Sequence, residues 1–497
     1  MMRPSSSRAA ILVALAVLIA YAPSLGGGWL WCDDLAVGES EQHTPVTSAA
    51  HWLLLRAFGP SPLAFRSLAL LLHAAAAVLL GTVARRLGLS GAFLGAAVFA
   101  LHPLCVESAA WVYETKNPLS LALAALSFHA WLSFEEGKRP RRALACALAL
   151  FAAALLAKPS VVVLPAIMCL ALILRGRIAP RSLASLAPFA ALAGACAAVT
   201  LAIEPELLPG EGPSGFGERF AVAGHVFWLA VEKTILPLSL SFSYERLDPA
   251  AAPLAPALLA ALAVVVSAGA AALARGAARA AGLAVLAFAA ALLPVLGFFD
   301  IYMMRYAFFA DHLAYPAVAV AALAAGPILA SRRAAPAALL LLAVLGASAA
   351  TRAATFRSEE ALWREAAERS PRSWLAQLEV GLAEKRAGRI EAAIDRFRRA
   401  RAERETVDAL VNLGNALVDA GRPEEALAPL GRAREISPGD AANHANAARA
   451  LAALGRLDEA IAAYRLAALF EPEDPLIRSN LAALVAARGA APESPPR

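Results

Sequence analysis

The chain has 497 residues, of which 60% are hydrophobic and only 17% are charged. Its mean hydropathy is +0.60, whereas an ordinary soluble domain is about 45–50% apolar, so a wholly soluble chain is excluded. The net charge of +6 does not indicate a nucleic-acid partner, because the cations fall in short clusters between apolar runs rather than along one face.

Long apolar runs fill roughly the first 350 residues. A spanning helix needs about 20 mostly apolar residues, so these runs predict about eleven membrane spans. A twelfth run, residues 225–240, has Glu232 and Lys233 at its centre. Because a charge at mid-bilayer is costly, we expect an interfacial or partly buried helix there. The predicted spans are Ala9–Leu25, Leu63–Val83, Leu87–Leu101, Pro118–Phe134, Ala143–Ala157, Val161–Leu174, Leu183–Ile203, Leu254–Leu273, Ala280–Phe299, Leu313–Ala330 and Ala334–Ala350.

The first run follows two arginines, and Ala20-Tyr21-Ala22 resembles a signal-peptidase site. Pro23 comes directly after it, which disfavours cleavage, so the run is predicted to be an uncleaved first span. Basic and acidic loops alternate along the chain, and basic loops face the cytoplasm. We therefore expect an integral protein of a bacterial inner membrane, with a cytoplasmic N-terminus and with everything after Ala350 outside. The basic clusters are Arg3/Arg8, Arg85/Arg86, Lys138–Arg142, Arg175–Arg181, Arg275/Arg279 and Arg332/Arg333.

A pattern with a period of about 34 residues recurs near the C-terminus and resembles the tetratricopeptide repeat. Gly388-Arg389, Gly421-Arg422 and Gly455-Arg456 follow this spacing, with small residues at fixed offsets around them. Small residues let paired helices pack closely, and Gly ends the first helix of each pair. The pattern predicts three units and a final helix at Pro475–Ala487. We expect a concave surface that binds a protein or peptide, with a structural spacer as the alternative.

These patterns predict an all-α protein, a polytopic membrane helix bundle followed by an α-solenoid. Residues 1–352 form the membrane domain, and residues 353–371 form a linker that carries Trp363. Residues 372–488 form the repeats, and the Pro-rich tail 489–497 is expected to be disordered.

The first outer loop carries an acidic pair, Asp33-Asp34, just beyond the first span and beside tryptophans. Such a pair suits an interfacial catalytic base or a metal ligand. The alternative is an exposed polar loop beneath an aromatic belt. Cys32 in this loop and Cys105 in the next both lie on the expected outer side, and the sequence leaves open whether they pair.

The second outer loop, from His102 to Asn117, is dense in polar and aromatic groups. Glu107, Trp111 and Glu114 have helical spacing, which places them on one face of a helix. Lys116-Asn117 at the start of the next helix combine a cation with a helix N-terminus, a natural phosphate site. The alternative is an interfacial helix whose acids face water.

Two later cations complete the candidates. Lys158 interrupts an apolar hairpin next to a proline, so it either meets an anion or extends to the surface. Arg305 lies in an aromatic segment that also holds Asp311 and His312. It either clamps a phosphate or forms an ion pair with Asp300 or Asp311.

Together these residues resemble a known family. An acidic pair after the first span, a His-Pro-x-x-x-Glu-Ser-x-x-Trp loop, a Lys-Pro between spans and an Arg-Tyr…Ala-Asp-His segment before the repeats are similar to the transmembrane and tetratricopeptide-repeat O-mannosyltransferase-like proteins. These belong to the GT-C superfamily of membrane glycosyltransferases. The resemblance implies a GT-C-like membrane domain that transfers a sugar, mannose or a similar hexose, from a polyprenyl-phosphate donor to an extracytoplasmic protein or glycan acceptor.

The resemblance also implies roles for individual residues. Asp33 or Asp34 is the general base that activates the acceptor hydroxyl. Lys116 and Arg305, together with Lys158, hold the lipid phosphate. The remaining predicted substrate-binding residues are His102, Glu107, Trp111, Asn117, Asp311 and His312.

A non-enzymatic membrane scaffold, with repeats that dock an envelope complex, is the rival interpretation. A transporter is disfavoured because few charges lie inside the spans, and buried polar contacts account for Arg66, His73 and His129. The predicted chemistry requires no cofactor, although the acidic pair is compatible with a divalent metal ion. The expected partners are the polyprenyl-phosphate-linked sugar, the acceptor, a protein on the repeats and membrane lipid, but no nucleic acid.

Overall fold

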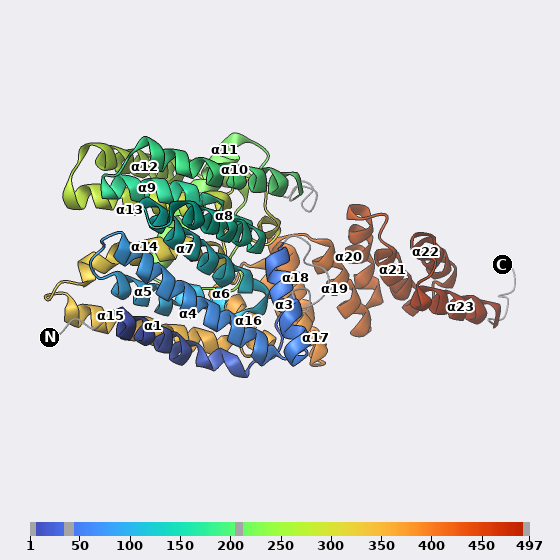
Figure 1. The fold of residues 1–497 in the computed structure, drawn as a ribbon. Coiled ribbons are helices and arrows are strands. Elements are labelled where there is room, and N and C mark those ends of the chain that lie inside the picture. Colours follow the sequence, from blue (N-terminus) through green and yellow to red (C-terminus); the bar gives the residue numbers. More distant parts are fainter. Residues whose placement is uncertain (1–5, 34–43, 204–211, 491–497) are drawn as a thin grey trace. The chain divides into compact units, whose positions relative to one another are not determined.

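The computed structural model describes residues 6–33, 44–203 and 212–490 (Figure 1). Every regular element in those ranges is a helix, and none is a strand, which confirms the predicted all-α class. The chain forms two compact units. The membrane unit comprises Met1–Phe242 and Leu247–Glu365, and the repeat unit comprises Ser243–Arg246 and Ala366–Arg497. Asp34 and most of the predicted tail lie outside the described residues.

The helices of the membrane unit alternate long apolar segments with short 3₁₀ turns. Proline stands in the first turn of several of them, where its missing N–H costs nothing. In chain order the elements are α1 (Ser6–Tyr21), η1 (Ala22–Gly26), α3 (Pro45–Phe58), α4 (Pro62–Arg86), α5 (Ala92–Leu101), η2 (Pro103–Cys105), α6 (Val106–Ala110), η3 (Val112–Thr115), α7 (Lys116–Glu135), α8 (Pro140–Ala157), η4 (Pro159–Val163), α9 (Leu164–Arg175), α10 (Pro180–Ile203), α11 (Phe216–Ile235), η6 (Pro249–Ala251), α12 (Ala255–Leu273), α13 (Gly276–Leu292), η7 (Leu293–Val295), η8 (Tyr302–Arg305), η9 (Asp311–Leu313), α14 (Tyr315–Leu329), α15 (Ala335–Thr355) and α16 (Glu359–Arg369).

Each predicted span overlaps one of these helices. In the described part of the chain, seven helices are long and apolar enough to cross a membrane. The number is eight if Ala92–Leu101 and Pro103–Ala110, which meet at a bend of 59°, form one broken span. Shorter apolar helices cover Pro159–Arg175 and Tyr315–Leu329. The chain is therefore an integral membrane protein, and the predicted count of eleven spans is approximate.

Helix α7 lies between two groups of helices in the membrane unit. On one side it packs against α4, which is joined by α1, α5, α14 and α15; on the other it packs against α8, beside α9 to α13 (Figure 1). Glycines allow a close approach between α5 and α14. A Cβ on Gly95 would lie 2.7 Å from the carbonyl oxygen of Ala322, so the two backbones are in direct contact.

Two of the polar side chains buried between the spans have internal partners. The guanidinium of Arg66 donates to the carbonyl oxygens of Ser24, Gly28 and Phe356 at 2.5–2.7 Å. The ring of His73 bonds the hydroxyl of Tyr315 at 2.7 Å. These bonds tie α4 to the turn after α1, to the start of α14 and to the end of α15.

The apolar run at residues 225–240 begins within α11, which ends at Ile235 and is not among the helices long and apolar enough to cross a membrane. It packs on α12, and Lys233 is buried with its ammonium 2.9 Å from the carboxylate of Glu232. The interfacial or partly buried position expected for this run stays a prediction. Helix α3, in the first outer loop, was not expected; it exposes Trp52, Leu53 and Phe58, the pattern of a helix lying at the membrane surface.

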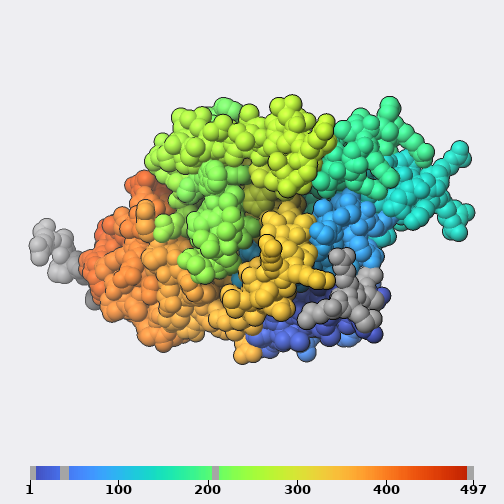
Figure 2. Space-filling model, turned by 90° about the vertical axis from the view of Figure 1, so that its left-hand side faces the viewer, coloured from blue at the N-terminus to red at the C-terminus, as the bar shows by residue number. Residues whose placement is uncertain are grey.

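Several basic clusters gather at one end of the membrane unit. Arg86 forms an ion pair with Glu136 at 2.9 Å, so the ends of α4 and α7 meet. Ser182, at the start of α10, donates to Glu135 at 2.6 Å, and Arg279, at the start of α13, donates to the end of α9. Figure 2 shows this end, including the turns that join α12 to α13 (yellow-green) and α14 to α15 (yellow).

The repeat unit consists of paired antiparallel helices, as the period predicts. Small residues bring the partners together: a Cβ on Gly381 would meet Phe397 at 2.5 Å, and one on Gly414 would meet Leu430 at 2.4 Å. The helices are α17 (Trp374–Arg386), α18 (Ile390–Glu403), α19 (Val407–Asp419), α20 (Pro423–Ile436), α21 (Ala441–Ala453), α22 (Leu457–Phe470) and α23 (Pro475–Ala490).

Candidate active site

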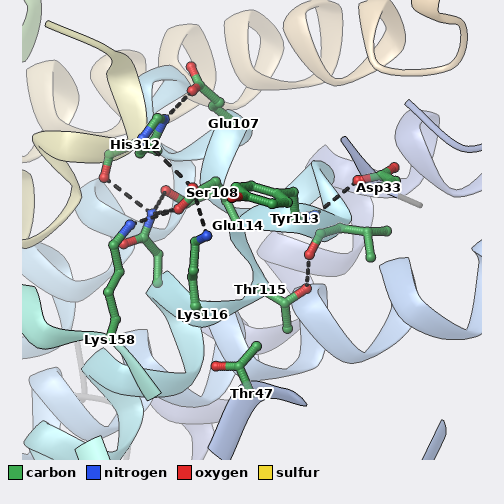
Figure 3. A network of polar contacts seen from close by, with 12 residues as sticks. Asp33, Thr47, Glu107, Ser108, Tyr113, Glu114, Thr115, Lys116, Lys158 and His312 are labelled. Carbon is green, nitrogen blue, oxygen red and sulfur yellow. Dashed lines mark hydrogen bonds and ion pairs between the residues drawn. The ribbon is translucent and has the colours of Figure 1, made fainter. Parts of the chain in front are cut away.

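The second outer loop folds into three short helices rather than one. The backbone is extended at His102, which separates α5 from η2, and again at Trp111, which separates α6 from η3. Glu107 and Glu114 are therefore not on one face of a continuous helix, which corrects that part of the sequence prediction. Both carboxylates nevertheless point toward the same imidazole, because the break at Trp111 turns the chain back on itself (Figure 3).

Glu114 is the centre of a buried charged cluster, with 2% of its surface exposed. The ammonium of Lys158 lies 2.8 Å from one of its carboxylate oxygens, and the ammonium of Lys116 lies 3.7 Å from the other. The amide of Asn117 donates to it at 2.7 Å. Lys158 therefore meets an anion rather than extending to the surface (Figure 3). We call Glu107, Glu114, Lys116, Asn117, Lys158 and His312 the Glu114 cluster.

His312 joins the two acidic residues of the loop. Its Nδ1 bonds Glu107, and its Nε2 lies 3.7 Å from Glu114. Asn117 also donates to the hydroxyl of Ser108 at 3.0 Å and to the carbonyl of His312 at 3.2 Å. The start of α7, the second loop and η9 are thus held together by polar bonds, although they lie far apart in the sequence.

The electrostatics of the cluster assign Glu114 a definite protonation state. Burial raises the pKa of the Glu114 carboxyl, but the charges of the imidazole and the two ammonium groups outweigh it and lower that pKa to about 2. At neutral pH the group is an ionised counter-ion. A carboxylate of such low basicity is a poor general base.

Asp33, near the start of the first loop, is fully buried. Its carboxylate accepts the backbone N–H of Leu30 at 2.8 Å and that of Tyr113 at 2.9 Å. Both carboxylate oxygens are therefore used to join the first loop to the second. The other predicted base, Asp34, is outside the described residues.

Lys116 and the aromatic residues form one continuous arrangement. The Lys116 ammonium lies 3.6 Å from the centre of the Tyr113 ring. Tyr113 stacks on Trp111 at 5.2 Å, and Trp111 stacks on Trp31 at 5.8 Å. Trp111, a predicted substrate-binding residue, is thus 1% exposed and enclosed by other rings.

Both ring nitrogens of His102 form hydrogen bonds with backbone groups. Its Nδ1 accepts the N–H of Leu104 at 3.2 Å, and its Nε2 lies 3.0 Å from the carbonyl of Thr234, on α11. It holds the start of the second loop in place, apart from the ion pairs of Glu114.

The two acids considered as partners of Arg305 bind other arginines. Asp300 binds Arg219 through two bonds of 2.9 Å, and Asp311 binds Arg352 at 2.6 Å. Arg305 ends η8, next to Tyr306, and is not among the residues paired with Glu114.

Two residues of this region were missed by sequence reasoning. Arg352 holds Asp311 and also lies 3.7 Å from Glu365 on α16. Trp363, also on α16, packs edge-to-face on Trp31 at 5.3 Å. The available signal was that Arg352 is the first cation after the last predicted span.

The described residues contain no group of three His, Cys, Asp or Glu side chains arranged to hold a metal ion. They also contain no disulfide, so Cys32 and Cys105 are not joined.

An apolar cavity of about 340 Å³ lies among α11, α12 and α13. Its walls include Phe227, Ala260, Leu293 and Phe298. Leu293 opens η7, which packs against η4, the turn that follows Lys158. An apolar space is therefore separated from the Glu114 cluster by only two short turns.

Comparison with known proteins agrees with this architecture. Residues 42–203, about a third of the chain, match the family model described as dolichyl-phosphate-mannose-protein mannosyltransferase. Residues 381–441 and 417–484 match two tetratricopeptide-repeat models. No curated protein matches the chain significantly.

Two solved structures illustrate the similarity. ArnT from Cupriavidus metallidurans, solved bound to undecaprenyl phosphate, has 13% identity and a TM-score of 0.36 over 86% of this chain and 80% of that one. The APC/C hetero-tetramer Cut9–Hcn1 has 15% identity and a TM-score of 0.26 over 92% and 97%. Such low scores support no conclusion about function. The chain is thus similar, over residues 42–203, to the dolichyl-phosphate-mannose-protein mannosyltransferase family and, over residues 381–484, to tetratricopeptide repeats.

Proposed function

We propose that the chain transfers mannose, or a similar hexose, from a polyprenyl-phosphate donor to a protein or glycan acceptor on the outer side of the membrane. The observation that carries this proposal is the convergence of Lys116, Lys158 and His312 on one buried carboxylate. Three cationic or protonatable groups sharing Glu114 form a site suited to a second anion. A phosphate on a lipid is an anion that reaches such a site at a membrane boundary.

Sugar transfer increases the charge on this phosphate. The donor is a phosphodiester with one negative charge, and breaking the bond between C1 and the phosphate oxygen leaves a lipid phosphate with about two. Lysine ammonium groups bind the product phosphate more strongly than the donor. The same groups therefore stabilise the transition state in which that charge develops.

The acceptor hydroxyl supplies the nucleophile. Its proton moves to a carboxylate, its oxygen attacks C1 of the sugar, and the C1–O bond to phosphate breaks with inversion. Asp33 and Asp34 remain the proposed bases. Because both oxygens of Asp33 accept backbone N–H groups and join the first loop to the second, we assign the proton transfer to Asp34 and the positioning of the loop to Asp33.

The polyprenyl chain needs an apolar site beside the phosphate. The cavity among α11, α12 and α13 supports this, since η7 at its edge packs on the turn after Lys158. Arg305 is proposed to bind the donor from η8. The gathering of basic residues at the far ends of α4 and α7 supports a cytoplasmic position for that end. The repeats then lie outside and bind the acceptor or a partner protein.

The test uses the full chain in lipid nanodiscs, with polyprenyl-phosphate mannose and a panel of peptide and glycan acceptors. Lys116→Gln and Asp34→Asn are each expected to lower transfer by about 10²–10⁴-fold. The matched control is Lys138→Gln, a lysine that is paired with a glutamate but exposed at the opposite end. Absence of transfer from every polyprenyl-phosphate hexose, or equal effects of Lys116→Gln and Lys138→Gln, would favour the scaffold interpretation.

A further inference from the structure

Six aromatic rings, including that of Trp31, pack together beside the Glu114 cluster. The rings come from the first loop, the second loop, the segment after α11, the end of η8 and α16. Their centres are 4.9–6.0 Å apart in the contacting pairs. We call this group the aromatic cluster; its members are Trp31, Trp111, Tyr113, Phe242, Tyr306 and Trp363.

Two polar groups inside the cluster lack partners. Trp111 and Trp363 are each 1% exposed, and neither indole N–H has a hydrogen-bond acceptor among the described residues. A buried tryptophan normally finds such a partner, and leaving a donor unsatisfied costs about 1–3 kcal/mol. One carboxylate oxygen of Glu107, also 1% exposed, is likewise without a donor in the described structure. The aromatic cluster therefore contains two unpaired donors, and the unpaired acceptor belongs to Glu107, whose partner His312 has its ring centre 6.1 Å from that of Trp111.

Trp31 is the ring best able to move. It is only half-buried, and its backbone φ of +33° lies in the left-handed region, which a bulky residue rarely adopts. Its ring contacts those of both Trp111 and Trp363. Displacing it would expose a space bounded by two aromatic rings and by their unpaired N–H groups.

The chemistry of that space matches a pyranose. The C–H faces of a sugar ring pack on aromatic rings, and its hydroxyl groups both accept and donate hydrogen bonds. An aromatic peptide side chain or a lipid chain would satisfy the apolar walls but not the unpaired groups. The cluster also leads to the cationic site, because Tyr113 contacts both Trp111 and the Lys116 ammonium.

We propose that the aromatic cluster binds the hexose ring of the donor, with Trp31 displaced and the indole N–H groups of Trp111 and Trp363 donating to sugar hydroxyls. The inference rests on the proposed function in that it places the phosphate of the same donor at Lys116. It adds the sugar subsite and assigns Trp363, from the helix that precedes the repeats, to substrate binding.

The test compares two probes, mannose 1-phosphate and inorganic phosphate, for equilibrium binding to the full chain in nanodiscs. Mannose 1-phosphate is expected to bind more tightly, because only it carries the ring. Trp363→Phe removes one N–H while keeping an aromatic ring, and it should weaken mannose 1-phosphate binding by about two- to tenfold while leaving inorganic phosphate unchanged. Binding should also shift tryptophan emission to longer wavelength, and Trp31→Phe should abolish that shift.

Trp131→Phe is the matched control. Trp131 is equally buried, but its N–H donates to Ser185 at 2.9 Å, near the opposite end of α7. The Trp131→Phe variant should lower the thermal unfolding midpoint more than Trp363→Phe does, because it loses an existing hydrogen bond. It should leave sugar binding intact.

Equal affinity for the two probes in the unmodified chain, or an unchanged affinity ratio in Trp363→Phe, would overturn the inference. The two proposals fail separately. If the chain binds mannose 1-phosphate through Trp363 but transfers no sugar, the proposed function fails alone. If it transfers sugar while Trp363→Phe leaves the KM for the donor unchanged, the sugar subsite fails alone.

Discussion

Replacing Glu114 by glutamine tests the electrostatic account of the site. The substitution keeps the shape of the side chain and removes its negative charge. Two ammonium groups, those of Lys116 and Lys158, would then share a buried position without their carboxylate. Removing one partner of a buried ion pair costs about 3–5 kcal/mol, because the remaining charge is uncompensated.

The lowered pKa of Glu114 gives a second value for the free energy by which its ion pairs stabilise the fold. The gap between its ordinary value of 4.5 and its folded value of about 2 corresponds to roughly 3 kcal/mol, at about 1.4 kcal/mol for each pH unit. Because the folded value is depressed, this stabilisation is fully present above about pH 4.5 and is lost as the pH falls toward 2. The cost of breaking a buried ion pair and the free energy from the pKa shift are therefore similar. We expect Glu114→Gln to lower the free energy of unfolding by roughly 3 kcal/mol at neutral pH.

The assay is thermal and denaturant unfolding of the full chain in detergent, at pH 7 and at successively lower pH. The difference between the unmodified chain and Glu114→Gln should shrink below about pH 4.5. Glu136→Gln is the matched control, since Glu136 also pairs with two cations but at an exposed position, where a pair contributes about 0–1 kcal/mol. Adding Lys158→Met to Glu114→Gln should recover stability. A loss no larger than that of Glu136→Gln, or no recovery in the double variant, would refute the reasoning.

Two further predictions concern packing and pairing elsewhere. Arg352→Met leaves the fully buried carboxylate of Asp311 without its 2.6 Å partner and should cost about 3–5 kcal/mol, measured as a drop in the unfolding midpoint. Gly414→Ala places a Cβ 2.4 Å from Leu430 and should destabilise the repeat unit by about 1–3 kcal/mol, whereas Gly431→Ala, with open space around it, should be neutral or stabilising; hydrogen exchange of the repeat helices separates the two.

Much of the fold followed from local patterns. Apolar runs predicted the membrane helices, and the glycine and alanine period predicted the paired helices of the repeats. Five of the polar residues singled out from the sequence lie together around Glu114, although their role in binding stays a prediction: Glu107, Lys116, Asn117, Lys158 and His312. Most of these residues could be singled out because ionisable groups are costly beside apolar runs and are retained there where they serve a function.

The sequence alone determined that the chain enters a membrane, that it is helical throughout its described regular elements and that helical repeats follow the spans, because hydropathy and repeat period are properties of neighbouring residues. Only the tertiary structure decided the pairings. Asp311 binds Arg352, Asp33 binds backbone N–H groups of two loops, and Trp363 joins the rings around Trp31. An ion pair or ring contact depends on distances between helix ends that are far apart along the chain, and no local pattern encodes those distances.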